Sequence, residues 1–188
     1  MEDLGNNIRR IRKEKGITIQ DLATATGLSP SFISRMERGD LNPSIASVKK
    51  LADALGIQVG SLFQEDSTEA ANDNEESMVV RKGRRRKIVY PGQKVSEYLL
   101  TPRVSDIGIE FILGIIESGG TSGTETYNHS GEECIFVLTG ELTIYVNERV
   151  FVLNEGDSIH FYSNNPHRWE NRGTETVQAV WAVTPPSF

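Results

Sequence analysis

The stretch that decides the N-terminal fold is QDLATATGLSPSFISRMERG, residues 20–39. Within it, Ala23, Gly27 and Ile33 have the spacing expected of two helices joined by a sharp turn. Such a motif needs a small residue where the helices touch, a glycine that can adopt positive φ in the turn, and a β-branched residue beneath the second helix. The stretch therefore predicts a helix-turn-helix.

The flanking sequence predicts that this motif sits in a bundle of five short helices. Thr18 and Asp21 have the spacing of a capping box. Ser29 can cap the next helix, and Pro30 suits its first position, where no N–H is needed. Apolar residues then recur at helical spacing. They are Leu4, Ile8 and Ile11 in the first helix, Ile33 and Met36 in the third, and Val48, Leu51, Ala52 and Leu55 in the fourth. The fifth helix is expected around residues 59–63.

Three segments of this region, IRRIRKEKGITIQDLA, GLSPSFISRMERGDLNPSI and VKKLADALGI, resemble the Xre/Cro/phage-repressor helix-turn-helix family. The resemblance covers about residues 4–63 and implies that the third helix enters the major groove of double-stranded DNA. It places Ser29, Pro30, Ser31 and Arg35 nearest the base edges, and Arg38 and Asn42 near phosphates. Ile19 departs from the pattern, since the family often has a polar residue early in the second helix for a phosphate contact.

Arg35 is the expected base reader, because an arginine can pair with guanine O6 and N7 through two hydrogen bonds. The alternative is an ordinary solvated cation on a helix surface. For the whole segment, the alternative is a helical bundle that binds protein instead of DNA.

The net charge of −6 is distributed unevenly along the chain. Counting Lys and Arg against Asp and Glu, residues 1–66 carry nine and nine, residues 67–87 six and four, and residues 88–188 five and thirteen. A neutral domain can still bind DNA if its cations cluster on one face. We expect a DNA-binding domain at 1–66, a linker and basic hairpin at 67–87, and a second domain at 88–188.

Within the linker, QEDSTEAANDNEES (64–77) has no periodic apolar residues and is expected to be a flexible, solvated tether. VVRKGRRRKIVY (79–90) follows, with a basic cluster between two short strand-like runs. An exposed hairpin is the preferred interpretation, since charge runs are usually solvated. The alternative is that Arg84, Arg85, Arg86 and Lys87 contact phosphates or the acidic second domain.

The second domain has the period of β-strands from residue 88 onward. The clearest strand candidates are IGIEFILGIIE, EECIFVLTG, ELTIYVNE, RVFVLN, SIHFYS and TVQAVWAV, separated by turn residues such as VNER and NEGD. Since no long helix interrupts them, they predict an antiparallel sandwich or β-barrel of jelly-roll type. The fold class is therefore α+β with two domains, an all-α bundle followed by an antiparallel barrel.

The spacings His129-x3-Glu133-x6-Gly140 and Gly156-x9-Pro166-His167-x3-Asn171 resemble the two motifs of the cupin superfamily. The resemblance covers about residues 88–185. It departs from the pattern where Tyr127 replaces the first histidine of the usual pair and where FYSNN replaces a Pro-x-Gly. The remaining set, His129, Glu133 and His167, could bind one divalent metal, with Fe(II), Zn or Ni as candidates. The alternative is a metal-free pocket in which these side chains bind an organic effector or one another.

Such a pocket would also have aromatic walls. The expected ligand-binding residues are Tyr127, Glu133, Tyr145, Trp169 and Trp181, with further carboxylates from Glu110, Glu132 and Glu141 near the cavity. Carboxylates and aromatic faces both favour a cation, so we expect an amine, a polyamine or an amino acid as effector. His160, which lies away from both motifs, is expected to be structural.

Several protein classes are disfavoured by composition. The single cysteine, Cys134, cannot form an internal disulfide and is expected to be a small apolar filler on a strand. No apolar stretch reaches the length of a membrane helix, and the N-terminus lacks the apolar core of a signal peptide. We therefore expect a cytoplasmic protein without a membrane partner.

The combination of helix-turn-helix and cupin resembles a set of bacterial regulators from end to end. That resemblance implies a homodimer built through the barrels, a pseudo-palindromic operator, and repression of a metabolic operon controlled by a small-molecule effector. The protein would then not be an enzyme. The alternative is a mononuclear non-haem iron cupin oxygenase or epoxidase that keeps the helix-turn-helix as a scaffold.

Overall fold

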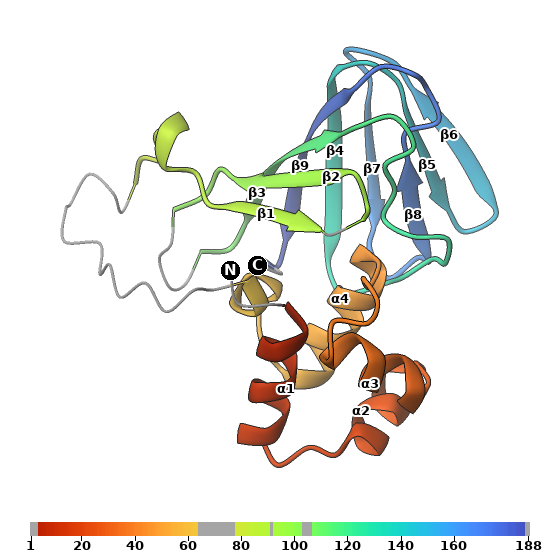
Figure 1. The fold of residues 1–188 in the computed structure, drawn as a ribbon. Coiled ribbons are helices and arrows are strands. Elements are labelled where there is room, and N and C mark those ends of the chain that lie inside the picture. The colour runs from red at the N-terminus through yellow and green to blue at the C-terminus, as the bar shows by residue number, and fades with distance from the viewer. Residues whose placement is uncertain (1–3, 64–77, 91, 103–106, 187–188) are drawn as a thin grey trace. The chain divides into compact units, whose positions relative to one another are not determined.

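The computed structural model describes residues 4–63, 78–90, 92–102 and 107–186. The chain divides near residue 67 into two compact units, of which the first carries the α-helices and the second the strands (Figure 1). This confirms an α+β chain with N-terminal helices and antiparallel sheets. The tether expected at 64–77 lies outside the described residues. No described helix has the length and apolar character needed to cross a bilayer.

The first unit contains four α-helices: α1 (Leu4–Glu14), α2 (Ile19–Thr26), α3 (Pro30–Glu37) and α4 (Ile45–Leu55). The fifth expected helix is instead a 3₁₀-helix, η1 (Val59–Phe63). Five residues are too few for a run of i→i+4 bonds, and the Ser61 N–H donates to the Gln58 carbonyl at 3.0 Å, three residues back. The prediction of five α-helices is corrected on this point.

The turn between α2 and α3 forms as its sequence predicts. Thr18 and Asp21 make a reciprocal capping box at the start of α2, and Gly27 ends the helix in the left-handed conformation with φ of 70°. The Ser29 hydroxyl accepts the Phe32 N–H at 3.1 Å and caps α3. Ile33 is fully buried beneath α3. Local side-chain chemistry is therefore sufficient to fix this part of the fold.

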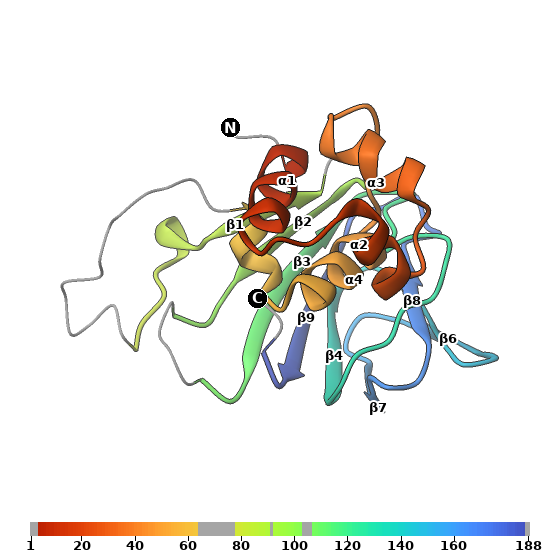
Figure 2. The same cartoon turned by 90° about the horizontal axis from the view of Figure 1, so that it is seen from below.

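The second unit contains nine described strands, all paired antiparallel. Their bounds are β1 (Lys87–Tyr90), β2 (Val95–Leu99), β3 (Glu110–Ile116), β4 (Glu132–Thr139), β5 (Leu142–Val146), β6 (Arg149–Leu153), β7 (Ser158–Tyr162), β8 (His167–Glu170) and β9 (Val177–Thr184). They form a six-stranded sheet in the order β1-β2-β3-β9-β4-β7 and a three-stranded sheet in the order β6-β5-β8. Figure 2 shows β1, β2, β3, β9 and β4 side by side in that order.

Of the sandwich and the barrel that the sequence left open, the described residues form two separate antiparallel sheets. The chain passes from one sheet to the other between β4 and β5, at Gly140 with φ of 81°. The β4–β9 ladder shifts register just before that point, between Val137 and Thr139. In the described residues, two isolated bridges, Thr121↔Glu170 and Tyr127↔His167, join the remaining segments. A bulge followed by a turn lets the chain change sheets without continuous pairing.

The core of the second unit lies between the two sheets, because alternate side chains of every strand point inward. Ile112, Ile135, Leu142, Ile144 and Val183 are among the fully or nearly fully buried residues. The basic run before β1 is not the hairpin that was expected. Residues 82–84 form a short 3₁₀-helix, η2 (Lys82–Arg84), and only Lys87 onward enters a strand.

Candidate functional site

The exposed surface of α3 carries the side chains expected to meet DNA. Ser29, Pro30, Ser31 and Arg35 are all exposed, whereas Ile33 and Met36, on the opposite side of the helix, are buried. This division puts one polar, partly cationic face of the helix toward solvent.

The two residues expected near phosphates are exposed as well. Asn42 lies in the loop after α3. Arg38 is already engaged locally, since its guanidinium donates to the Asp40 carboxylate at 2.8 Å and to the Ser34 hydroxyl at 2.6 Å. A phosphate would have to compete with Asp40 for this side chain.

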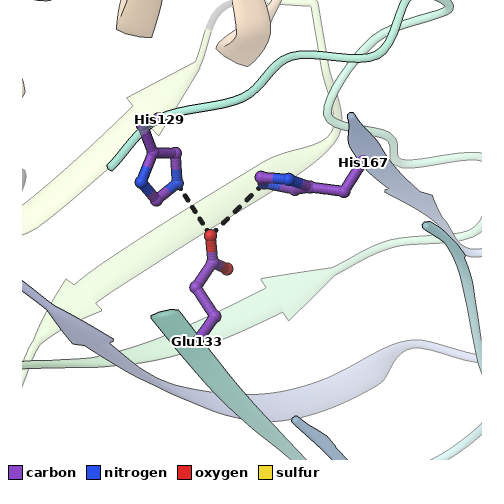
Figure 3. Close-up of side chains that lie close together, drawn as sticks. All are labelled: His129, Glu133 and His167. Carbon is purple, nitrogen blue, oxygen red and sulfur yellow. Dashed lines mark ion pairs between the residues drawn. The ribbon is translucent and has the colours of Figure 1, made fainter. Parts of the chain in front are cut away.

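In the second unit, His129, Glu133 and His167 come together between the sheets (Figure 3). One Glu133 carboxylate oxygen lies 2.7 Å from His129 Nε2 and 3.3 Å from His167 Nε2. Glu133 and His167 are each only 1% exposed. His129 lies before β4, Glu133 on β4 and His167 on β8, so the cluster joins both sheets.

Both imidazoles are oriented by their other nitrogen. His129 Nδ1 lies 3.0 Å from the Ser130 carbonyl and His167 Nδ1 lies 2.8 Å from the Asn165 carbonyl. Because a carbonyl only accepts, each Nδ1 carries a hydrogen, and each Nε2 is turned toward the Glu133 carboxylate. Neither Nε2 has a hydrogen-bond partner among the described residues.

This arrangement fits a divalent metal. Two imidazole nitrogens and a carboxylate oxygen converge, and these are donor types that a single divalent ion can bind together. Ligands at about 2.0–2.2 Å from one ion lie roughly 3 Å from each other, close to the two nitrogen–oxygen distances found here. The carbonyl contacts at Nδ1 are the usual means of orienting metal-binding histidines.

Aromatic side chains surround the cluster. The Tyr127 ring lies 4.3 Å from that of His167, and the Phe161 ring lies 5.0 Å from it, measured between centroids. Trp169 and Trp181 are buried and in contact, with centroids 5.5 Å apart. The structure therefore brings four of the five predicted ligand-binding residues, Tyr127, Glu133, Trp169 and Trp181, into the interior between the sheets.

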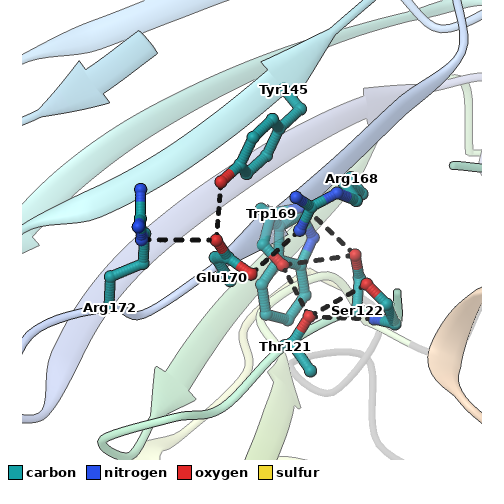
Figure 4. Close-up of polar contacts among 8 residues, drawn as sticks. Thr121, Ser122, Tyr145, Arg168, Trp169, Glu170 and Arg172 are labelled. Atoms are coloured by element: carbon teal, nitrogen blue, oxygen red, sulfur yellow. Dashed lines mark hydrogen bonds and ion pairs between the residues drawn. The ribbon is translucent and has the colours of Figure 1, made fainter. Parts of the chain in front are cut away.

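The fifth, Tyr145, lies on the other side of its sheet. Its neighbours Ile144 and Val146 are buried inward, while Tyr145 lies in a surface network in which its hydroxyl donates to Glu170 at 2.6 Å (Figure 4). The Arg168 guanidinium stacks 3.5 Å from its ring centre. Residues that alternate along a strand point to opposite faces, so Tyr145 does not share the interior with His167 and Trp169.

The other residues expected near the cavity also differ in whether they point into the interior or toward solvent. Glu110 is buried, as a residue near a cavity would be, but Glu141 is exposed. Glu132 points outward and pairs with the exposed His160 at 2.7 Å. Cys134 was expected to fill a core position and is instead exposed on β4, because Glu133 and Ile135 on either side take the inward positions.

Two buried polar residues were missed by sequence reasoning. Tyr90 donates a hydrogen bond to Glu97 at 2.8 Å, and both side chains are buried. Burial and the neighbouring Glu97 carboxylate raise the pKa of the Tyr90 phenol well above its usual value. The alternation of Val95, Glu97 and Leu99 would have placed Glu97 inward, had β2 been recognised as a strand.

Comparison with known proteins agrees with both units. Residues 8–62 match a helix-turn-helix family model and residues 113–183 match a cupin domain model. The chain is 27% identical over 184 residues to the HTH-type transcriptional regulator PuuR of Escherichia coli, covering 98% of this chain and 96% of that one.

Two solved structures share the arrangement of the chain. An HTH_3 family transcriptional regulator from Vibrio cholerae has a TM-score of 0.71 at 24% identity, covering 98% of this chain and 96% of that one. The hydroxypropylphosphonic acid epoxidase from S. wedmorenis has a TM-score of 0.50 at 17% identity, covering 97% and 96%. Similarity at this level shows a shared fold and no more. The chain therefore combines an XRE-type helix-turn-helix domain with a C-terminal cupin domain, and it is similar over its whole length to a transcriptional regulator with that domain order.

Proposed function

We propose that this regulator binds a specific DNA sequence through α3 and represses a metabolic operon. The observation that carries the proposal is the exposed face of α3, where Ser29, Pro30, Ser31 and Arg35 lie opposite the buried Ile33 and Met36. A helix so arranged can enter the major groove with its N-terminal residues at the base edges. Arg38 and Asn42 would contact phosphates of the DNA backbone beside that groove.

The test compares Arg35→Ala with Arg9→Ala, which removes an exposed arginine from α1. Binding is measured to a duplex selected by the protein from a randomised pool and to a duplex of random sequence. Arg35→Ala should weaken binding to the selected duplex by about 1–3 kcal/mol and affect the random duplex much less. Equal loss on both duplexes for Arg35→Ala would exclude base reading by this residue.

We further propose that the interior of the cupin domain is the sensor site. His129, Glu133 and His167 would hold one divalent metal, and a metal there would supply a fixed positive charge and an open coordination position for a small molecule. Tyr127, Trp169 and Trp181 would form the apolar walls. The buried carboxylates Glu97 and Glu110 favour a cationic group, such as an amine, on the effector.

Sensing requires that the effector bind the DNA-competent and DNA-incompetent states with different affinity. The decisive measurement is DNA binding with and without a panel of amines, polyamines and amino acids. One compound should release the selected duplex, and Glu133→Gln should abolish the response while leaving binding to DNA in place. If no compound on the panel changes the affinity for DNA, the proposal of a cationic effector is wrong.

The protein is proposed to act as a homodimer. The outward side of the six-stranded sheet carries a continuous uncharged surface, here called the outer face, made of Phe111, Leu113, Ile115, Cys134, Phe136, Val180 and Ala182. Phe111 and Phe136 remain 42% and 44% exposed. An antiparallel sheet normally turns polar residues outward, and an exposed apolar surface of this extent marks an interface.

A second copy is the partner that suits the outer face best. The strand unit is otherwise acidic, so two copies repel each other except across an uncharged surface, and one face can be self-complementary about a two-fold axis. The whole sheet, with six strands about 4.8 Å apart and roughly 20 Å long, offers about 600 Å² per copy, and about half of this lies on the three strands that carry the outer face. The area of the whole sheet lies at the lower limit of stable interfaces. A dimer would also present two copies of α3, as a pseudo-palindromic operator requires.

The second candidate function is a mononuclear iron oxygenase or epoxidase. One observation favours it: the two-histidine, one-carboxylate cluster, which is a donor set suited to non-haem Fe(II). The discriminating experiment loads the purified protein with Fe(II) and measures oxygen consumption in the presence of the effector panel. Turnover without specific DNA binding would favour the enzyme, and specific DNA binding without turnover favours the regulator.

A further inference from the structure

Residues 81–87, RKGRRRK, are here called the basic segment and form the densest run of positive charge in the sequence. Six of the seven residues are cationic, and no carboxylate occurs between residues 78 and 90. By contrast, residues 1–66 carry equal numbers of cations and carboxylates, and residues 88–188 are strongly acidic. The domain that carries the helix-turn-helix, residues 1–66, therefore has no net positive charge with which to attract the phosphates of DNA.

The basic segment has a defined place at the edge of the second unit. The Arg84 N–H donates to the Arg81 carbonyl at 2.8 Å within η2, and the Arg86 carbonyl accepts the Leu99 N–H at 3.0 Å. Lys87 then begins β1, the edge strand of the six-stranded sheet. These bonds attach the segment to the sheet, and the side chains of Arg81, Lys82, Arg84 and Lys87 are exposed.

Three cations of this segment carry no ion pair. Among the residues that the structure describes, no carboxylate pairs with Lys82, Arg85 or Lys87, and Lys87 lies instead 5.5 Å from the centre of the Tyr98 ring. Lys82 and Lys87 are also exposed to solvent. The positive charge of these side chains is therefore available to an anion from outside the second unit.

We propose that the basic segment is a second DNA-contacting element, which binds backbone phosphates of the duplex that α3 enters. The inference rests on the proposed DNA-binding function. Eighteen residue steps separate Phe63 from Arg81, a length that spans at most about 60 Å. One turn of B-DNA is about 34 Å long, so both elements can reach one duplex. Phosphate contacts add affinity without adding sequence readout, which supplies the charge that the helical unit lacks.

The test is the salt dependence of DNA binding by the full chain carrying Lys82→Gln, Arg85→Gln and Lys87→Gln together. Each phosphate contact contributes about 0.9 to the slope of log Kobs against log salt, so loss of three should lower the slope by about 2–3. Affinity should fall by the same factor on the selected duplex and on a random duplex. The ratio of the two affinities, which measures specificity, should stay unchanged.

The matched control removes the same charge elsewhere in the second unit, with Lys94→Gln, Arg149→Gln and Arg172→Gln. This variant should keep the wild-type slope. If the basic-segment variant has the same slope as the wild-type protein, the inference is wrong. The proposed function is unaffected by that result as long as the wild-type protein binds the selected duplex. Absence of specific binding by the wild-type protein would instead overturn the proposed function, and this inference with it.

Discussion

Arg12 of α1 and Glu37 of α3 are joined by two parallel hydrogen bonds, from Nε at 2.6 Å and from Nη2 at 2.9 Å, in the interior of the helical unit. A third bond runs from Nη1 to the Ile17 carbonyl at 2.8 Å. The hydrogen bonds to Glu37 raise the pKa of Arg12 above its usual value, with burial acting against them. This pair fixes α1 against the helix proposed to enter DNA.

The first prediction follows from that pair. Glu37→Gln leaves the Arg12 guanidinium buried without its counter-charge, so unfolding of the helical unit should become easier by about 3 kcal/mol. Helical circular dichroism during chemical denaturation measures this. Glu14→Gln breaks the exposed Arg10 pair and should change stability by less than about 1 kcal/mol. Equal effects of the two substitutions would contradict the view that burial makes the Arg12 pair important.

The second prediction concerns pH and Glu170. Burial alone would raise the pKa of this carboxyl, but hydrogen bonds from Tyr145 and Arg168 and the charges of Arg168 and Arg172 outweigh it and lower the pKa. A carboxyl with a lower pKa in the folded state stabilises the fold above its unfolded pKa and loses that contribution as pH falls through the folded value. The unfolding temperature of the wild type should therefore drop on acidification below about pH 4.5.

The measurement is tryptophan fluorescence during heating, at a series of pH values. Glu170→Gln should be less stable than the wild type at neutral pH and should approach it at low pH. Glu155→Gln, which removes an exposed carboxylate between β6 and β7, is the control for loss of surface charge. A Glu170→Gln variant whose deficit is the same at every pH would show that the carboxylate charge is not responsible.

The third prediction tests the metal centre with the three histidines of the chain. Protein loaded anaerobically with Fe(II), or with Zn or Ni, should retain about one ion per chain by elemental analysis. His129→Ala and His167→Ala should each lose the ion, because two of three ligands rarely suffice. His160→Ala should keep it, since His160 pairs with Glu132 on the outside of the sheet. Retention by all three variants would remove this cluster as the site.

The fourth prediction tests the outer face as the dimer interface. Phe136→Glu puts a charge on that surface and should convert the dimer into a monomer in light-scattering measurements. Val150→Glu is the matched control, since Val150 on β6 is 55% exposed and apolar but lies in the other sheet. It should remain dimeric. A monomeric wild-type protein at micromolar concentration would exclude the proposed dimer.

Cys134 gives an independent measurement of the same interface. It is the single cysteine of the chain and is exposed within the outer face. If that surface packs against its copy, a short bismaleimide should link two chains in high yield, and Phe136→Glu should abolish the link. Efficient linkage in the Phe136→Glu variant would mean that the crosslink reports collision rather than a specific interface.

The sequence predicts this protein best where structure is local. Thr18, Ser29 and Gly27 fix their helix ends through bonds to residues a few positions away, so the helix-turn-helix could be read directly. His129, Glu133 and His167 could be grouped only because their spacing resembles that of a known superfamily. The bridge that brings Tyr127 beside His167 joins segments far apart in the chain, which no local pattern encodes.

The alternating direction of side chains along a strand explains most of the predictions that were wrong. Tyr145 and Trp169 were assigned to one pocket by residue type, but a shift of one position along a strand reverses the direction of a side chain. β2 was missed because Val95–Leu99 (VSEYL) does not alternate between apolar and polar residues, since its central inward position is occupied by Glu97. The change of sheet at Gly140 likewise depends on which strands pair, and this is settled by the whole fold.

Strand β4 connects the cluster of His129, Glu133 and His167 with the outer face. Glu133 points inward to the histidines and Cys134, the next residue, points outward into the outer face. Their Cα atoms are about 3.8 Å apart along one peptide unit. A shift of β4 that accompanied ligand binding at Glu133 would therefore also move Cys134 on the surface where we propose that two subunits meet. On these two proposals, a change in the interior would reach the subunit interface across the thickness of a single strand.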